Sequence, residues 1–207
     1  FSRYDLPRED QLRYLGFMSH DVNRLLANIN RILDLARIET KSYQKGRECI
    51  DIVKMIEEFC EQNSDLFRGC DIAIHNPSQG RPYYWINRPL FEMLLMNLFT
   101  NAIKYNQSDR PRIDITFVPQ KNGLDIRITD NGMGIEKGET KKIFRKFYQV
   151  GRTEDMTAKG TGLGLYLVEQ VALIHQARVT AESPGLGKGS TFTLKMPPAI
   201  RGMETAS

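Results

Sequence analysis

Three polar residues interrupt the apolar stretch "RPLFEMLLMNLFTNAIKY" (residues 88–105), and their spacing indicates a shared role. They are Asn97, Asn101 and Lys104. Intervals of four and three residues put them on one face of a helix. A carboxamide oxygen is a suitable ligand for Mg²⁺, which takes its other ligands from water and phosphate, and a lysine adds positive charge for the same phosphates. The solvent-facing side of an amphipathic helix gives the same pattern, so the assignment needs support from other segments.

Two glycine-containing segments supply that support. "TDNGMGI" (residues 129–135) follows an alternating strand pattern, and its Asp130 can accept a hydrogen bond from an exocyclic amine such as that of adenine. The glycines of this segment let backbone approach a flat ring closely. "KGTGLGL" (residues 159–165) opens the next helix, where bare N–H groups and the helix dipole favour an anion. The spacing is not that of a Rossmann fingerprint, and no P-loop lysine follows.

A polar segment, basic in its first half, separates the two glycine-containing segments. It covers residues 136–159. Loops of this length inside a compact domain are usually functional lids or disordered. We interpret this one as a mobile lid over phosphates.

The order of these motifs resembles that of the ATP-binding catalytic domain of sensor histidine kinases, which share a superfamily with gyrase, mismatch-repair and heat-shock chaperone ATPases. "NLFTNAIKY" is similar to the asparagine box of the family, "DNGMGI" and "GTGLGL" to its two glycine boxes, and "IFRKFY" to its phenylalanine box. "DLARIE" resembles the end of the second helix of the dimerisation and phosphotransfer hairpin that precedes the domain. The resemblance extends from Asp5 to Pro197.

The resemblance implies a protein-histidine kinase of a two-component system, with ATP and Mg²⁺ as cofactors. Asn101 would hold Mg²⁺, and Asp130 would bind the adenine amine with Thr191 nearby. The bare amides before and within the start of the next helix would cradle the phosphates. The implied ATP-binding residues are Asn97, Asn101, Lys104, Tyr105, Asp130, Gly132, Gly134, Ile135, Lys146, Tyr148, Gly160, Thr161, Gly162, Leu163, Gly164, Leu165 and Thr191.

Two positions bear on turnover. Asn97 stands where the ATP hydrolases of the superfamily have a glutamate that activates water. A carboxamide has no useful proton affinity near neutral pH, so the sequence favours phosphoryl transfer to a nucleophile supplied elsewhere. Gln149 stands where many members have an arginine that contacts phosphate. That difference supports an alternative, a degenerate nucleotide-site module that acts in dimerisation or partner docking without turnover.

His20, followed by an acidic residue, has the appearance of a phosphate acceptor. In the family the acceptor lies on the first helix of the hairpin, ahead of a turn and the second helix. Only sixteen residues separate His20 from Arg37, with no proline or glycine among them. We therefore expect His20 to belong to the second helix and the accepting helix to be absent from this fragment, so no catalytic residue is assigned within it.

The pattern of the whole chain predicts an α+β fold. With 41% hydrophobic and 26% charged residues, the 207-residue chain has the composition of a globular protein. We expect a two-layer sandwich of a mixed, mostly antiparallel sheet with helices on one face, preceded by a long N-terminal helix. Residues 1–44 are predicted as the second hairpin helix plus linker, residues 45–200 as the ATP-binding catalytic domain, and residues 201–207 as a tail.

The apolar stripe of the N-terminal helix is close to a heptad pattern and calls for a partner helix. The resemblance implies a homodimer through the hairpin in the parent protein, and a response regulator as partner. A net charge of +4 is too small to indicate nucleic acid. No apolar run is long enough to span a membrane, and three cysteines without CxxC spacing favour a reducing compartment. We expect a cytoplasmic fragment without membrane contact, whose parent could be anchored in the inner membrane.

Overall fold

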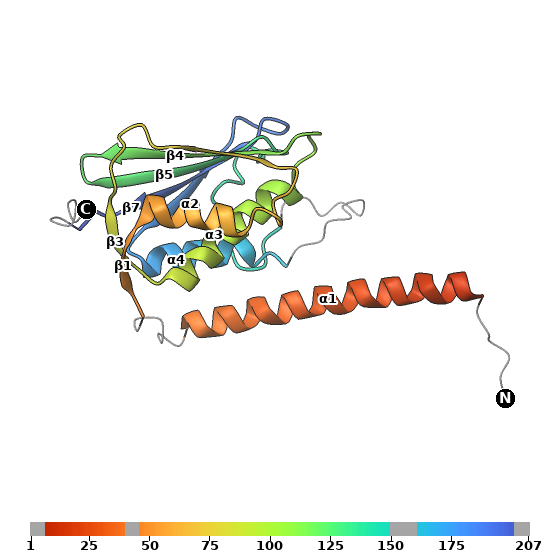
Figure 1. Cartoon of the computed structure of the whole chain (residues 1–207). Helices are drawn as coiled ribbons and strands as arrows, with labels where there is room; N and C mark the ends of the chain where they lie inside the picture. Colours follow the sequence, from red (N-terminus) through yellow and green to blue (C-terminus); the bar gives the residue numbers. More distant parts are fainter. Residues whose placement is uncertain (1–6, 40–45, 150–160, 201–207) are drawn as a thin grey trace. The chain divides into compact units, whose positions relative to one another are not determined.

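The computed structural model of the chain describes residues 7–39, 46–149 and 161–200 (Figure 1). The chain divides into two units, residues 1–41 and 42–207. The expected boundary between residues 44 and 45 lies outside the described residues and stays a prediction. Every residue predicted to bind ATP belongs to the second unit.

The described part of the first unit, residues 7–39, forms the helix α1 (Arg8–Glu39), of 32 residues. His20 lies within this uninterrupted helix, so the chain makes no hairpin between His20 and Arg37. The side chain of His20 is outside the described residues. No helix in the described part of the chain has both the length and the apolar character to cross a membrane. Several apolar side chains at near-heptad spacing are exposed: Leu12, Leu15, Val22, Leu26, Ile29 and Leu33.

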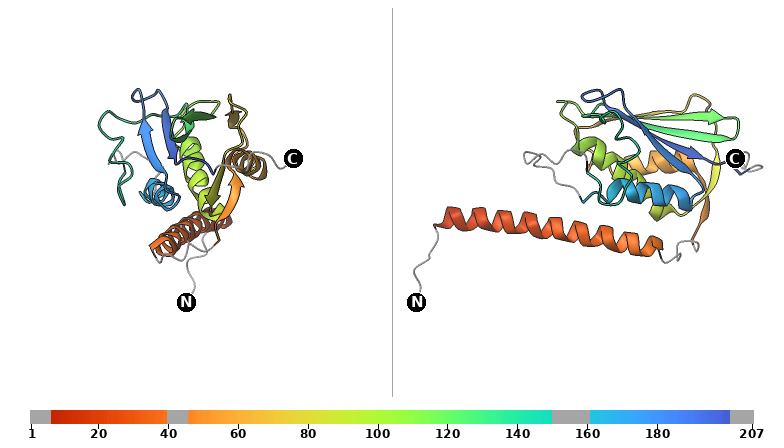
Figure 2. Two further views of the ribbon diagram at one scale, coloured as in Figure 1. Left: turned by 90° about the vertical axis from the view of Figure 1, so that its left-hand side faces the viewer. Right: turned by 180° about the vertical axis from the view of Figure 1, so that it is seen from behind.

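The second unit is built on a five-stranded sheet with helices on one face (Figures 1 and 2). In spatial order the strands are β2 (Asp71–His75), β4 (Arg112–Gln120), β5 (Gly123–Asp130), β7 (Ser190–Met196) and β6 (Arg178–Glu182). The covering helices are α2 (Ile52–Gln62), α3 (Arg88–Lys104) and α4 (Gly164–Ile174). β2 pairs with β4 in parallel, and the other neighbours pair antiparallel. The predicted α+β fold is confirmed.

Alternation along the strands decides which face of the sheet the helices cover. On β4, Ile113, Ile115 and Phe117 are buried, whereas the residues between them are only partly buried. Because successive side chains of a strand point to opposite faces, the buried set marks the helix-covered face and leaves a more polar, open face. By the same alternation on β5, Asp130 shares the helix-covered face with the buried Ile128.

Aromatic packing holds α3 against its neighbours. Phe99 of α3 contacts the rings of Phe59 and Phe67 with centroid distances of 5.5 and 5.2 Å. The helix begins after Asn87, whose side-chain oxygen accepts a hydrogen bond from the Leu90 amide at 3.3 Å. Asn87 therefore acts as an N-cap, a position where a short polar side chain satisfies an otherwise unpaired helix amide. These contacts fix the helix that carries the predicted magnesium ligand.

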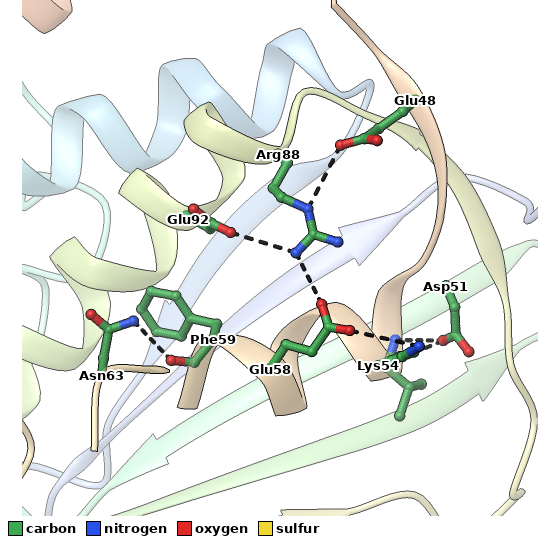
Figure 3. A network of polar contacts seen from close by, with 9 residues as sticks. Glu48, Asp51, Lys54, Glu58, Phe59, Asn63, Arg88 and Glu92 are labelled. Carbon is green, nitrogen blue, oxygen red and sulfur yellow. Dashed lines mark hydrogen bonds and ion pairs between the residues drawn. The ribbon is translucent and has the colours of Figure 1, made fainter. Parts of the chain in front are cut away.

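A second, two-stranded sheet is formed by β1 (Glu48–Asp51) and β3 (Tyr83–Ile86). Arg88, at the start of α3, joins this sheet to two helices (Figure 3). Its Nε lies 3.6 Å from Glu48 Oε1, and its Nη1 lies 3.2 Å from Glu58 Oε2 and 3.6 Å from Glu92 Oε1. One guanidinium thus connects carboxylates of β1, α2 and α3.

Replacing Arg88 by methionine should lower the free energy of unfolding by about 1 kcal/mol, because three carboxylates then lose the cation that they share. Of the three, Glu58 retains a second cation, Lys54, whose Nζ lies 3.7 Å from Glu58 Oε1. Urea titration measures the change, and added salt should reduce it. Arg127→Met is the control, since that guanidinium pairs with one carboxylate, Asp125, at 3.9 Å on the open face. We expect the control to change stability by less than about 0.5 kcal/mol. Equal effects of the two substitutions would contradict a cooperative network.

His175 connects the end of α4 to the start of α3. The side chain is buried, its Nε2 accepts a hydrogen bond from the Asn87 amide at 3.1 Å, and its Nδ1–H donates to the Val171 carbonyl at 2.8 Å. The centroids of the His175 and Phe91 rings lie 5.5 Å apart, with the two rings nearly perpendicular. Only the neutral imidazole can accept at Nε2. Burial, aided by the positive charge of Arg47, lowers the pKa of His175, while the bond to Val171 opposes this.

The free energy of unfolding should decrease as the pH falls below 6.5. The folded state keeps His175 neutral below its ordinary pKa of 6.5, so the unfolded chain binds the extra proton in that window and is favoured by acid. His175→Gln removes this titration and should flatten the dependence of stability on pH, measured by urea titrations over that range. His75→Gln, the same change at an exposed histidine, should retain the slope. An unchanged slope in His175→Gln would refute the assignment.

Candidate nucleotide site

Asn97 and Asn101 lie on the face of α3 that meets the beginning of α4. A Cβ added to Gly164 would lie 2.9 Å from Asn97 Oδ1 and 3.9 Å from Asn101 Nδ2. Asn97 Nδ2 donates to the Met93 carbonyl at 2.8 Å, which leaves Asn97 Oδ1 facing Gly164. Within the described residues the carboxamide of Asn101 makes no hydrogen bond. Its oxygen is therefore available to a ligand.

Asp130 ends β5 with one carboxylate oxygen fixed by the protein. Oδ1 accepts hydrogen bonds from the Gly132 amide at 2.8 Å and the Ser190 amide at 3.2 Å. The second oxygen, Oδ2, bonds to none of the residues that the structure describes. Burial raises the pKa of Asp130, and the two N–H donors act against that shift. The carboxylate can accept one further N–H group from a bound molecule.

Ser190, and not Thr191, lies beside Asp130. In the pairing of β5 with β7, Asp130 is opposite Ser190 and Thr129 is opposite Thr191. Cross-strand partners share a face, so Thr191 belongs to the open face of the sheet. Its hydroxyl lies 3.0 Å from that of Thr129, and both line a shallow polar hollow of about 380 Å³ there. The expectation that Thr191 lies near the adenine-binding carboxylate is thus corrected by one residue, a difference that the strand register decides.

The turn after Asp130 packs against the C-terminal end of α3. The Met133 amide donates to the Tyr105 carbonyl at 2.9 Å, and a Cβ on Gly132 would lie 3.0 Å from the same oxygen. Lys104 Nζ lies 5.1 Å from the centroid of the Tyr105 ring. Asp130, Tyr105 and Lys104 therefore gather at the end of the helix that also carries the two asparagines.

Gly134 and Ile135 form the second half of this turn. Gly134 has a φ of +72°, and a Cβ there would lie 2.2 Å from the Gly185 carbonyl oxygen. No other residue type fits that space without moving backbone. The side chain of Ile135 is 9% exposed. Its low exposure is consistent with the predicted role in lining a pocket for a base.

The glycine-rich segment precedes α4, which begins at Gly164. Gly162 has a φ of +69°, and a Cβ there would lie 2.6 Å from the carbonyl carbon of Phe147. The Phe147 amide donates to the Gly162 carbonyl at 2.9 Å, which joins the segment interpreted as a lid to the glycine-rich segment. The Leu163 side chain is buried.

The first turn of α4 offers amides to an anion. No side chain among the described residues caps the helix, so the amides at Gly164 and Leu165 keep their donor capacity. Thr161 Oγ1 lies 3.4 Å from the Leu163 amide. Gly160, the first glycine of the predicted cradle, lies outside the described residues.

Two residues of the lid were predicted to contact the nucleotide. Lys146 Nζ lies 5.8 Å from the centroid of the Tyr166 ring, in the first turn of α4. The hydroxyl of Tyr148 donates to a carboxylate oxygen of Glu139 within the lid. Lys146 is therefore at the end of α4 that offers free amides. The hydroxyl of Tyr148 instead bonds to Glu139 of the same segment.

The chemistry of this donor set fits a magnesium nucleotide. The two asparagines belong to α3, the start of α4 lies against them, and the turn at Gly132 contacts Tyr105, the residue that follows α3. In the described part of the chain no group of three or more His, Cys, Asp or Glu side chains could hold a metal. A cation bound through one carboxamide needs phosphate and water as further ligands, which is the usual manner of Mg²⁺.

The family comparison agrees with this geometry. The family described as "Histidine kinase-, DNA gyrase B-, and HSP90-like ATPase" matches residues 87–200. The match covers more than half of the chain, so the chain belongs to this family. Within it, the second unit is an ATP-binding catalytic domain of the sensor histidine kinase class.

Individual relatives are sensor kinases. The sensor histidine kinase RppB of Synechocystis sp. is 31% identical over 188 residues, which cover 88% of this chain and 41% of that protein. WalK of Bacillus subtilis is 28% identical over 186 residues, 89% of this chain and 30% of that protein. The chain thus spans less than half the length of these curated relatives.

Solved structures share the fold. Full-length ShkA in complex with AMPPNP is similar over 98% of this chain and 42% of its own, with a TM-score of 0.75 and 22% identity. The mycobacterial sensor histidine kinase MprB is similar over 74% of this chain and 99% of its own, with a TM-score of 0.62 and 20% identity. At these identities the likeness shows the fold alone.

Proposed function

We propose that this chain binds Mg-ATP at the site around α3 and transfers the γ-phosphoryl group to a histidine on a helix outside the chain. The observation that carries the proposal is the availability of three complementary groups around one helix. These are the second oxygen of Asp130, the unbonded carboxamide of Asn101 and the uncapped first turn of α4. They match a base amine, a metal ion and phosphate oxygens respectively.

Each group has its own task in this proposal. Asp130 accepts the adenine amine while Ile135 and Tyr105 border the ring. Asn101 holds Mg²⁺ with Asn97 beside it, and Lys104 and Lys146 attract the phosphates. Mg²⁺, when bound, would neutralise charge on the transferring phosphoryl group. The remaining residues of the glycine-rich segment supply backbone amides.

Asn97 supports transfer of the γ-phosphoryl group to another nucleophile over hydrolysis of ATP by water. Its Nδ2 donates to the Met93 carbonyl, so the carboxamide oxygen faces the start of α4. A carboxamide oxygen cannot take a proton from water near neutral pH. The chain would then position the phosphates and leave the nucleophile to another segment.

The partners belong to the same proposal. The exposed apolar side chains of α1, Leu12 to Leu33, suit a second copy of the parent chain as in a hairpin dimer, and a response regulator would receive the phosphoryl group. The free thiols of Cys49, Cys60 and Cys70 agree with a cytoplasmic site of action. The division into a hairpin helix up to residue 44 and a catalytic domain over residues 45–200 remains part of this proposal.

Calorimetry with a non-hydrolysable ATP analogue tests the proposal. We expect saturable binding that weakens when EDTA removes Mg²⁺. Absence of binding at millimolar analogue would overturn it and favour the degenerate docking module that Gln149 suggests. Incubation with γ-labelled ATP should leave the chain itself unlabelled. Acid-labile phosphate on His20 would show that the accepting histidine had been assigned to the wrong helix.

A further inference from the structure

Ser183, in the loop between β6 and β7, occupies the centre of a hydrogen-bond network under the turn that follows Asp130. Its Oγ accepts hydrogen bonds from the Ile135 amide at 3.0 Å and the Gly185 amide at 3.2 Å. The same hydroxyl lies 2.7 Å from the Gly189 carbonyl oxygen and 3.2 Å from that of Gly185, and it donates its one hydrogen to the nearer, Gly189. A serine hydroxyl has one donor and two acceptor positions, so this side chain is fully used.

The loop also contacts the turn through its backbone. The Gly187 amide donates to the Met133 carbonyl at 2.7 Å, and the Gly189 amide donates to the Gly132 carbonyl at 3.0 Å. The next amide, that of Ser190, donates to Asp130. The loop from Ser183 to Ser190 is therefore continuous with the residues that orient the Asp130 carboxylate.

From these contacts we infer that Ser183 is a positioning residue for recognition of the adenine base. It fixes the Ile135 amide on one side and the Gly189 carbonyl on the other, so that Ile135 and Asp130 keep one spacing. The inference rests on the proposed function, because it assumes that the base binds between these two residues. Among the described residues, Ser183 bonds to Ile135, Gly185 and Gly189 and to no predicted phosphate-binding group, so its effect should be on the base alone.

Ser183→Ala removes the acceptor of the Ile135 amide and the donor to Gly189 together. We expect the affinity for the non-hydrolysable ATP analogue to fall about tenfold, as for the loss of one or two buried hydrogen bonds. The affinity for ADP should fall by the same factor, since the lost contacts concern the base and not the γ-phosphate. The ratio of the affinity for the ATP analogue to the affinity for the corresponding GTP analogue should decrease.

Two further variants separate positioning from a general loss of structure. Ser183→Thr keeps the hydroxyl and should restore most of the affinity and the base preference. Ser78→Ala is the control. Ser78 is an exposed serine in the loop between β2 and β3, where it bonds to Asn76 and Gly80. This variant should leave the affinity and the base preference unchanged. Thermal unfolding of each variant, in the absence of nucleotide, shows whether the fold is retained.

The outcomes are distinguishable. If the unaltered chain binds no nucleotide, the proposed function fails and the inference fails with it. If the unaltered chain binds and Ser183→Ala keeps its affinity and base preference, the inference alone is overturned. A fall in affinity without any change in base preference, not restored by Ser183→Thr, would also overturn it. Should Ser183→Ala fail to fold, Ser183→Cys, which keeps a weaker hydrogen-bonding group, must show the reduced base preference.

Discussion

Replacing Asp130 by asparagine should reduce the affinity for ATP by about a hundredfold, which is about 2.8 kcal/mol. Oδ1 already accepts from the Gly132 and Ser190 amides, so the asparagine oxygen would take that position. Its NH₂ group would then occupy the place of Oδ2 and present a donor to the donating amine of the base. Calorimetry with the non-hydrolysable analogue measures the loss.

The matched control is Asp125→Asn on the same strand. Asp125 lies on the open face, where it bonds to Gln120 and pairs with Arg127. The substitution makes the same chemical change without touching the helix-covered face, so the affinity should stay within about twofold. Equal affinities of the Asp130 and Asp125 variants would mean that the base binds elsewhere.

Local patterns in the sequence were sufficient for the elements that carry the site. The apolar periodicity around Asn97 and Asn101 predicts α3, and the alternation before Asp130 predicts β5. Both signals arise because a helix or strand at the boundary of a core buries one face. For the same reason the predicted two-layer fold agrees with the structure.

Those local patterns could not predict contacts between residues far apart in the sequence. Which of Ser190 and Thr191 lies beside Asp130 depends on the register between β5 and β7, sixty residues apart, and a shift of one residue exchanges the two faces. Nothing in the sequence indicated that Ser183 is a positioning residue, since its bond to the Ile135 amide joins residues 48 positions apart.

The glycines of the loop between β6 and β7 show how this site depends on backbone contact. Gly187 and Gly189 have nearly equal φ values, +73° and +70°. A Cβ on Gly187 would meet nothing within 4 Å, whereas a Cβ on Gly189 would lie 2.0 Å from the Asp130 carbonyl oxygen. The two positions thus share the cost of a left-handed conformation and differ in the space around them.

Gly187→Ala should lower the free energy of unfolding by about 1 kcal/mol, the strain of an alanine at positive φ. Gly189→Ala should lower it by about 3 kcal/mol, because the added methyl group meets backbone that cannot rotate away. Separating β7 from Asp130 would also withdraw the Ser190 amide from the carboxylate, so nucleotide affinity should fall at least about tenfold in this variant alone. Urea titration and calorimetry measure the two quantities. Equal losses in both variants would show that backbone strain, and not the contact with Asp130, makes glycine necessary there.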